Sequence, residues 1–274
     1  MNMPSVSVMT MVFGGPLTEG SLTDVAMLEA LERMGFDGVE VPSGRLTEQP
    51  QRLKAYCAYL GSSRLKATCI DGGCNFVAPD QATRAKGVAA LHAAIEVALT
   101  LKCPLVLAAG SRLLGNITPA EGRRMIIDGL QACIATANET GITLAIENFG
   151  VAPTLQCAAA HCLEILNAVP GLAFVFDTGN FYFCREDPLQ NMDALMSRTR
   201  HVHLKDWVKS DTPEIADVSG AALGTGLIPN EQIVRKFRSV NPAANLSLEV
   251  GAPGDKIKAV QQDLETVRRW LNSA

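Results

Sequence analysis

The chain has 274 residues, of which 47% are hydrophobic and 19% are charged, so it can bury a substantial core. Its formal net charge is −4, whereas nucleic-acid-binding proteins usually carry a positively charged surface, and we therefore expect no nucleic-acid partner. Charged residues interrupt every apolar run, and the N-terminus has no secretory pattern, which predicts a cytoplasmic protein without a membrane partner. The eight cysteines include no C-x-x-C pair, which favours free, buried thiols over disulfides or a zinc–cysteine site.

Short β-rich runs alternate with helical stretches along the whole chain. The runs expected to form strands are residues 5–13, 38–41, 65–71, 104–110, 142–148, 172–179, 201–207 and 245–251. The expected helices occupy residues 21–35, 50–60, 80–101, 118–140, 154–168, 187–198, 229–239 and 255–272. The helix at 118–140 opens with Thr118, Pro119 and Glu121, which together form a capping-box start.

Strand–helix alternation on this scale predicts an α/β fold, a single (β/α)8 TIM barrel over residues 1–274. A doubly wound open sheet is the alternative fold. It usually has fewer strand–helix units than the eight expected here, and no G-x-G-x-x-G motif follows the first strand. Residues 209–226 form the longest break between elements. We expect them to be an active-site loop, because barrel enzymes build their sites from the loops that follow the strands.

Ionisable residues fall inside four of the expected strands, near their carboxyl ends. Strands of a parallel barrel are buried on both faces, and alternation points Glu147, Asp177, His203 and Glu249 into the barrel. Three carboxylates so close together cannot all stay ionised without a cation. We therefore predict one divalent ion, and the oxygen-rich ligands favour Mn²⁺, with Mg²⁺, Co²⁺ or Zn²⁺ as alternatives. Structural ion pairs are the competing interpretation, for example Lys205 with Glu147 or Glu249.

Six short motifs occur in order along the chain: GFDGVEV (35–41), LAIEN (144–148), FDTGN (176–180), HVHLKD (201–206), LGTG (223–226) and SLEVG (247–251). Together they resemble the xylose-isomerase-like TIM-barrel superfamily, which includes sugar phosphate isomerases and epimerases, ketose 3-epimerases and inosose dehydratases. The resemblance implies that Glu147, Asp177, His203 and Glu249 bind the metal, and that Glu147 and Glu249 also act as acid and base. It further implies a homo-oligomer, such as a dimer or tetramer.

Four more residues are expected to contact the substrate. Asn180 stands where many family members carry a substrate-contacting His, and it can donate a hydrogen bond but cannot titrate. Lys205 faces inward after His203, Glu40 ends the second strand, and Trp207 is an aromatic residue that can form an apolar wall. The loop after the seventh strand lacks the arginine that several ketose epimerases place on their sugar.

The expected activity is a metal-dependent isomerisation or epimerisation of a small-molecule sugar or cyclitol. A glutamate would remove the proton next to a carbonyl, and an enediolate would form. A lyase, such as an inosose-type dehydratase or a keto-sugar eliminase, is the alternative on the same site. A non-catalytic barrel subunit is less favoured because the ligand set is intact. The apurinic endonuclease branch is also less favoured, because the chain has only four histidines and is acidic.

Overall fold

Eight parallel strands close into a barrel in the computed structural model, which describes residues 3–211, 217–249 and 251–273. The strands are β1 (Val6–Met9), β2 (Gly38–Pro42), β3 (Lys66–Gly72), β4 (Leu105–Ala108), β5 (Thr143–Glu147), β6 (Ala173–Asp177), β7 (Thr199–Leu204) and β10 (Asn245–Leu248). Each strand pairs with its neighbour in chain order, and β10 closes the ring on β1 through parallel pairs such as Leu246 with Val6. The predicted single (β/α)8 barrel is confirmed.

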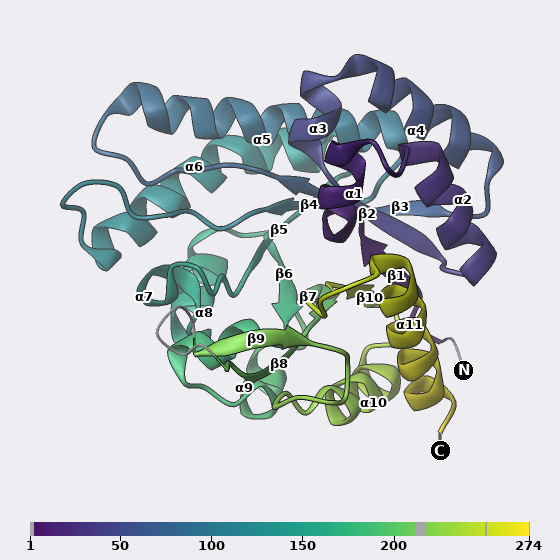
Figure 1. Ribbon diagram of the computed structural model, residues 1–274. Coiled ribbons are helices and arrows are strands. Elements are labelled where there is room, and N and C mark those ends of the chain that lie inside the picture. Colours follow the sequence, from purple (N-terminus) through teal and green to yellow (C-terminus); the bar gives the residue numbers. More distant parts are fainter. Residues whose placement is uncertain (1–2, 212–216, 250, 274) are drawn as a thin grey trace.

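Helices form the outer layer (Figure 1), and the long helices α5 and α6 lie side by side. Eight helices match the expected ones: α2 (Asp24–Met34), α4 (Pro50–Ser62), α5 (Gln81–Leu101), α6 (Pro119–Glu139), α8 (Ala159–Ala168), α9 (Pro188–Leu195), α10 (Asn230–Val240) and α11 (Lys256–Asn272). Short elements that the pattern did not predict are η1 (Thr10–Phe13), α1 (Gly14–Glu19), α3 (Ser43–Glu48), α7 (Pro153–Gln156) and η2 (Asn180–Cys184). Within the described residues, no helix has the length and apolar character needed to span a membrane.

The first expected strand, residues 5–13, is too long, because β1 ends at Met9 and the chain turns into η1. Thr10 fixes this turn, since its hydroxyl donates a hydrogen bond to the carbonyl of Glu40. The expected strand 201–207 is also divided. It ends at Leu204, and the chain then forms a separate antiparallel ribbon of β8 (Asp206–Lys209) and β9 (Val218–Ala221). Only the last residue of β8 and the whole of β9 lie within the expected loop 209–226, of which residues 212–216 are outside the described range.

Alternation along the strands separates two hydrophobic layers, as the sequence pattern predicts. Phe174 and Phe176 of β6 point outward, and Phe176 packs against Phe181 and Phe237 at ring-centroid distances of 5.3 and 5.7 Å. A smaller apolar cluster fills part of the barrel interior and consists of Cys69, Leu105, Leu107, Ala145, Ala173 and Val175. Burial of both layers supplies most of the free energy that holds the strand ends, and therefore the site, in place.

The LGTG motif wraps around one buried carboxylate. Asp206 accepts hydrogen bonds from the backbone amides of Trp207, Gly224, Gly226 and Ile228 at 2.9–3.0 Å. A side chain at Gly226 would collide with this carboxylate, so only glycine fits. The motif therefore anchors the return from the β8–β9 ribbon to α10.

Asp263 of α11 also binds the LGTG turn, at its first residue, Leu223. Its side chain is 1% exposed, Oδ1 accepts the amide hydrogen of Leu223 at 2.9 Å, and Oδ2 has no partner among the described residues. Burial raises the pKa of Asp263 to about 6, and the Leu223 amide lowers it only in part. The fold therefore favours the protonated carboxyl.

This burial predicts a pH-dependent stability that Asp263→Asn removes. Because the pKa is raised in the folded state, the wild-type chain gains stability as pH falls from about 6 toward 4 and loses it as pH rises. Asparagine cannot ionise, so relative to wild type the variant should gain on the order of 2 kcal/mol between pH 4.5 and pH 8. Urea unfolding at both pH values measures this difference, and parallel pH profiles for the two proteins would contradict it.

Candidate metal centre

The four predicted metal ligands converge at the carboxyl ends of the strands. Glu147 ends β5, Asp177 ends β6, His203 lies in β7, and Glu249 follows β10 directly. The Nδ1 atom of His203 lies 3.4 Å from a carboxylate oxygen of Glu147, 3.7 Å from one of Glu249 and 3.8 Å from one of Asp177. Three of the residues, Glu147, Asp177 and His203, offer ligand atoms that all lie within 4.8 Å of one another.

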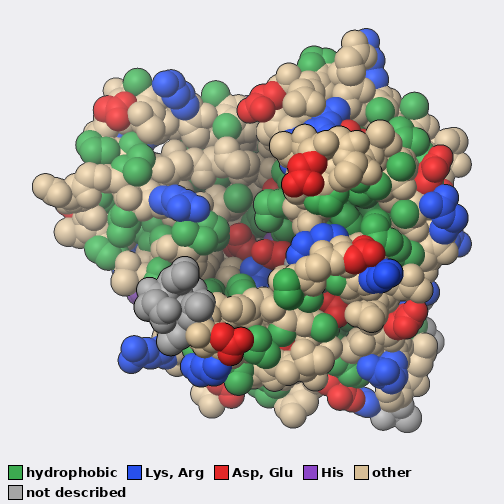
Figure 2. Space-filling view, viewed as in Figure 1, with side chains coloured by type: hydrophobic (Ala, Val, Ile, Leu, Met, Phe, Trp, Pro, Cys, Tyr) green, Lys and Arg blue, Asp and Glu red, His purple; other side chains and the backbone are tan. Residues whose placement is uncertain are grey.

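The cluster is largely shielded from solvent. The side chains of Asp177 and His203 are 0% and 1% exposed, that of Glu147 is 9% exposed, and that of Glu249 is 23% exposed. Figure 2 shows a hollow in the middle of this face, over the region where Figure 1 places β6 and β7, with acidic and basic side chains at its bottom. Glu249 is thus the ligand with the freest access to a molecule entering the mouth.

Glu40 sets the orientation of the His203 ring. One of its oxygens lies 2.8 Å from His203 Nε2, and the other accepts from His201 Nε2 at 2.9 Å and from the Ser247 hydroxyl at 2.6 Å. Burial alone would raise the pKa of Glu40, but His203 and His201 hold it well below the ordinary value. The ionised carboxylate accepts the Nε2 hydrogen of His203, so Nδ1 faces the other three carboxylates.

Two buried atoms at the centre of the cluster have no hydrogen-bond partner among the described residues, Asp177 Oδ2 and His203 Nδ1. Burial lowers the pKa of His203, but Glu40 and Glu147 outweigh it and place the pKa well above the ordinary value. Burial also raises the pKa of Asp177 to about 7. The electrostatics therefore call for a cation beside Nδ1, either a proton or a metal ion.

Lys205 supplies part of the required positive charge. Its Nζ atom lies 2.7 Å from Glu249 Oε2 and 2.8 Å from Asp177 Oδ2, the latter an ion pair without hydrogen-bond geometry. Burial alone would lower the pKa of Lys205, but Asp177, Glu249 and Glu147 raise it above the ordinary value. Three carboxylates and one ammonium leave two formal negative charges, which a divalent ion would neutralise. The residues present therefore fit such an ion.

The other expected substrate residues lie in two different places. Asn180 borders the cluster, with its Oδ1 3.4 Å from Lys205 Nζ, and Trp207 donates its indole hydrogen to the carbonyl of Gly179. Glu40 was expected to contact substrate, and this expectation needs correction. Its side chain is 0% exposed inside the barrel and both of its oxygens are occupied, so it positions His203 instead.

Two further residues lie at the site, and sequence reasoning missed one of them, Asn148. Asn148 joins the ends of β5 and β6, because its side-chain amide donates to the carbonyl of Asp177 and accepts from the amide of Asp177, both at 2.9 Å. Asp71 is the next-to-last residue of β3, and burial raises the pKa of its carboxyl well above the ordinary value, while its Oδ1 has no partner among the described residues. The LAIEN motif contained a signal for Asn148, and the position of Asp71 at the end of the expected strand 65–71 was a weak signal for a substrate contact.

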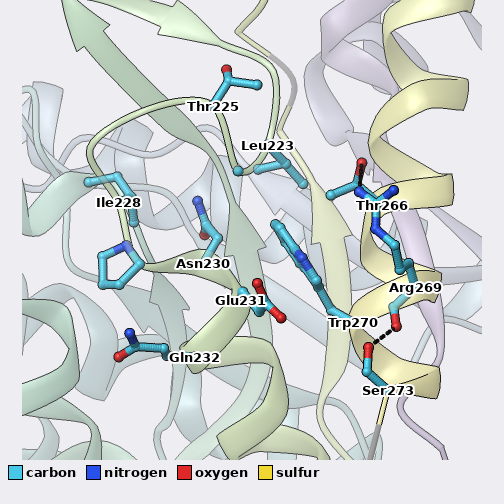
Figure 3. Close-up of a pocket in the computed structure, with 12 residues that line it drawn as sticks. Leu223, Thr225, Ile228, Asn230, Glu231, Gln232, Thr266, Arg269, Trp270 and Ser273 are labelled. Atoms are coloured by element: carbon cyan, nitrogen blue, oxygen red, sulfur yellow. Dashed lines mark hydrogen bonds between the residues drawn. The ribbon is translucent and has the colours of Figure 1, made fainter.

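A second hollow, of about 540 Å³, lies on the outer wall of the barrel between α10 and α11 (Figure 3). Trp270 and Arg269 of α11 line it together with Glu231 of α10. Glu231 already pairs with Arg235 at 2.8 Å, and none of the four metal ligands lies in this wall. The candidate ligands lie instead at the barrel mouth.

Comparison with known proteins places the chain in a family. The model of the xylose isomerase-like TIM barrel family matches residues 28–273, so the chain belongs to this family. Among proteins with curated descriptions, no relative matches the sequence.

Solved structures share the fold at low sequence identity. The IolI protein with a bound zinc atom superposes with a TM-score of 0.81 at 16% identity, covering 97% of this chain and 98% of that one. A probable 3-DHS dehydratase from Bacillus anthracis gives a TM-score of 0.78 at 15% identity, with 96% and 98% covered. A D-tagatose 3-epimerase-like protein gives 0.78 at 18% identity, with 97% and 98% covered. Structures described as a probable dehydratase and as an epimerase-like protein thus share this barrel.

The role of Glu40 can be tested by Glu40→Gln. The amide has only one accepting oxygen and presents hydrogens to the imidazoles, so His203 loses its fixed tautomer. We expect affinity for Mn²⁺ or Zn²⁺ to fall by about 10- to 100-fold, measured by calorimetry. Glu265→Gln makes the same chemical change on the exposed face of α11 and should leave the affinity unchanged. Equal affinities in all three proteins would rule out this role.

Proposed function

We propose that the chain is a divalent-metal-dependent sugar isomerase or epimerase that removes a proton from a carbon next to a carbonyl. The observation that carries the proposal is the meeting of two glutamates, Glu147 and Glu249, with His203 in one shielded barrel mouth. The epimerase-like and dehydratase neighbours support it, because both reactions can begin with removal of an activated proton.

Glu147, Asp177, His203 and Glu249 would hold the ion. Once bound, a divalent ion stabilises the negative charge that develops on the substrate oxygens as a Lewis acid. The oxygen-rich ligand set favours Mn²⁺. The zinc atom of the IolI protein makes Zn²⁺ the first alternative.

The two glutamates can carry the proton transfers. They come from β5 and from the end of β10, with β6 and β7 between them, so they reach the mouth from different sides. One carboxylate takes the proton as the C–H bond breaks, and the electron pair moves onto the carbonyl oxygen to form an enediolate. Return of a proton by the other glutamate, from the opposite face, inverts the carbon.

Lys205 and its neighbours would hold the substrate. The ammonium sits between Asp177 and Glu249, where it can donate a hydrogen bond to a substrate oxygen. It also lies 5.8 Å from the centre of the Trp207 ring, which packs edge-on against Phe183 at 5.6 Å. An apolar wall beside a charged donor suits a sugar ring, which has both C–H faces and hydroxyl groups.

A lyase is the second candidate, and the position of Lys205 favours it. Proton removal by a glutamate would be followed by loss of a hydroxyl group on the next carbon, with Lys205 Nζ as the proton donor to that group. Nζ is 2.7 Å from Glu249 and is therefore close to the carbon that loses the proton. The dehydratase description of one structural neighbour is consistent with this reaction.

Incubation with ketoses, inososes and 3-keto-glycosides in D₂O with Mn²⁺ separates the two reactions. An epimerase should return a product that differs from the substrate only at the inverted carbon, where one deuterium replaces hydrogen, whereas a lyase should release water or, from a 3-keto-glycoside, the aglycone. Mass spectrometry and NMR read both outcomes. Absence of any exchange or turnover with all three substrate classes would count against both.

Glu147→Gln and Glu249→Gln test the roles of the two glutamates. Glutamine can still offer an oxygen to a metal but cannot accept the proton, so we expect solvent-deuterium exchange to slow by about 100- to 10,000-fold. Bound metal is quantified in parallel, so that loss of the base is distinguished from loss of the ion. Exchange at the wild-type rate in either variant would exclude that glutamate as the base.

A further inference from the structure

The opposite end of the barrel contains a hollow of about 460 Å³. Its wall is made where the strands begin, from Ser5 before β1, Lys66 at the start of β3, Thr143 at the start of β5 and Asn245 at the start of β10. The hollow is therefore separated from the metal centre by the length of the strands. None of the four candidate metal ligands lines this hollow.

Three cations line this hollow, namely Lys66, Lys102 and Arg200. None of the described residues that line it is acidic, although the chain as a whole carries a net charge of −4. Arg200 donates hydrogen bonds only to the backbone carbonyls of Ser197 and Thr199, and the described part of the chain offers no ion pair to either lysine. The local positive charge is therefore not neutralised by the protein.

Lys102 occupies a backbone position that favours glycine. It follows α5 in the left-handed region, with φ of 54°. Three other helix-to-strand turns use glycine for this conformation, Gly35 before β2, Gly141 before β5 and Gly171 before β6, with φ of 91°, 73° and 87°. A non-glycine residue is strained there, because its Cβ crowds the backbone. The turn before β4 thus accepts conformational strain and places an ammonium group beside the hollow.

The floor of the hollow is polar and closed. His201 is 0% exposed, and its Nδ1 lies 3.2 Å from the side-chain amide of Asn245, whose oxygen accepts from the Ser5 hydroxyl. Beyond His201 lies Glu40, which contacts the metal ligand His203. A molecule in the hollow therefore cannot reach the catalytic mouth through the barrel.

We propose that this basic hollow binds a small multivalent oxyanion, a phosphate or polycarboxylate group, at a site separate from the metal centre. Its volume is within the range of small-molecule sites. The three cations supply charge, and the hydroxyl group of Thr143 supplies a donor at the rim. The concave shape suits a compact ion rather than an extended nucleic acid.

Calorimetry of metal-free protein with pyrophosphate and with citrate tests the site without interference from metal chelation. Wild type should bind at least one of the two, and the preferred anion identifies phosphate or carboxylate as the source. Lys66→Gln and Lys102→Gly should each weaken binding by about tenfold, because each removes a charged contact. Absence of binding by wild type at millimolar anion would overturn the proposal.

Lys102→Gly also separates lost binding from lost folding. Glycine relieves the left-handed strain, so the variant should unfold at an equal or higher urea concentration while it binds the anion more weakly. Arg185→Gly is the matched control, because Arg185 is the other non-glycine residue at positive φ, 61°, among the described residues, and it lies at the opposite end of the barrel after β6. It should keep wild-type anion affinity. Equal weakening by both glycine variants, or by neither, would sink the proposed site. The assay uses neither metal nor sugar, so its failure would leave the proposed isomerase activity untouched.

Discussion

The site depends on one electrostatic constraint, that several carboxylates packed into a shielded barrel mouth require positive charge between them. Positively charged and hydrogen-donating side chains are placed next to the carboxylates at successive levels along the barrel axis. Glu40 lies inside the barrel and accepts from His201 and His203, and the far nitrogen of His203 meets the three mouth carboxylates. Lys205 then bridges two of these from above. Along the barrel axis, carboxylates thus alternate with hydrogen-bond donors or cations. This alternation lowers the free-energy cost of burying the charged groups.

Strand periodicity accounts for much of what the sequence could predict. Side chains alternate across a strand, so a run such as LAFVFD directs Phe174 and Phe176 to the helices and Asp177 to the barrel interior. The same rule predicted the convergence of Glu147, His203 and Glu249, because parallel strands end at one face. Fold and ligand cluster therefore follow from local pattern and one geometric rule.

Features that depend on long-range contacts could not be predicted in this way. The pairing of β2 with β3 shifts register between Val39 and Glu40, and Glu40 is held inside the barrel by partners from β7 and β10. A carboxylate at a strand end looks the same in sequence whether it faces substrate or a histidine. The β8–β9 ribbon is a similar case, since Asp206 holds it through amides up to 22 residues away.

The two histidines of the HVHLKD motif, His201 and His203, belong to a series of polar contacts inside the barrel that extends from the start of the strands to their carboxyl ends. Residues two apart in a strand share a face, so His201 and His203 both point inward and both donate to Glu40. His201 also contacts Asn245 near the start of the strands, whereas His203 contacts the three mouth carboxylates at the carboxyl ends of the strands. One buried carboxylate, Glu40, therefore fixes the tautomers of both rings. The interior apolar cluster that includes Leu107 and Val175 packs the neighbouring strands together. Rigidity at the mouth thus has its origin in the barrel interior, below the level at which substrate would bind.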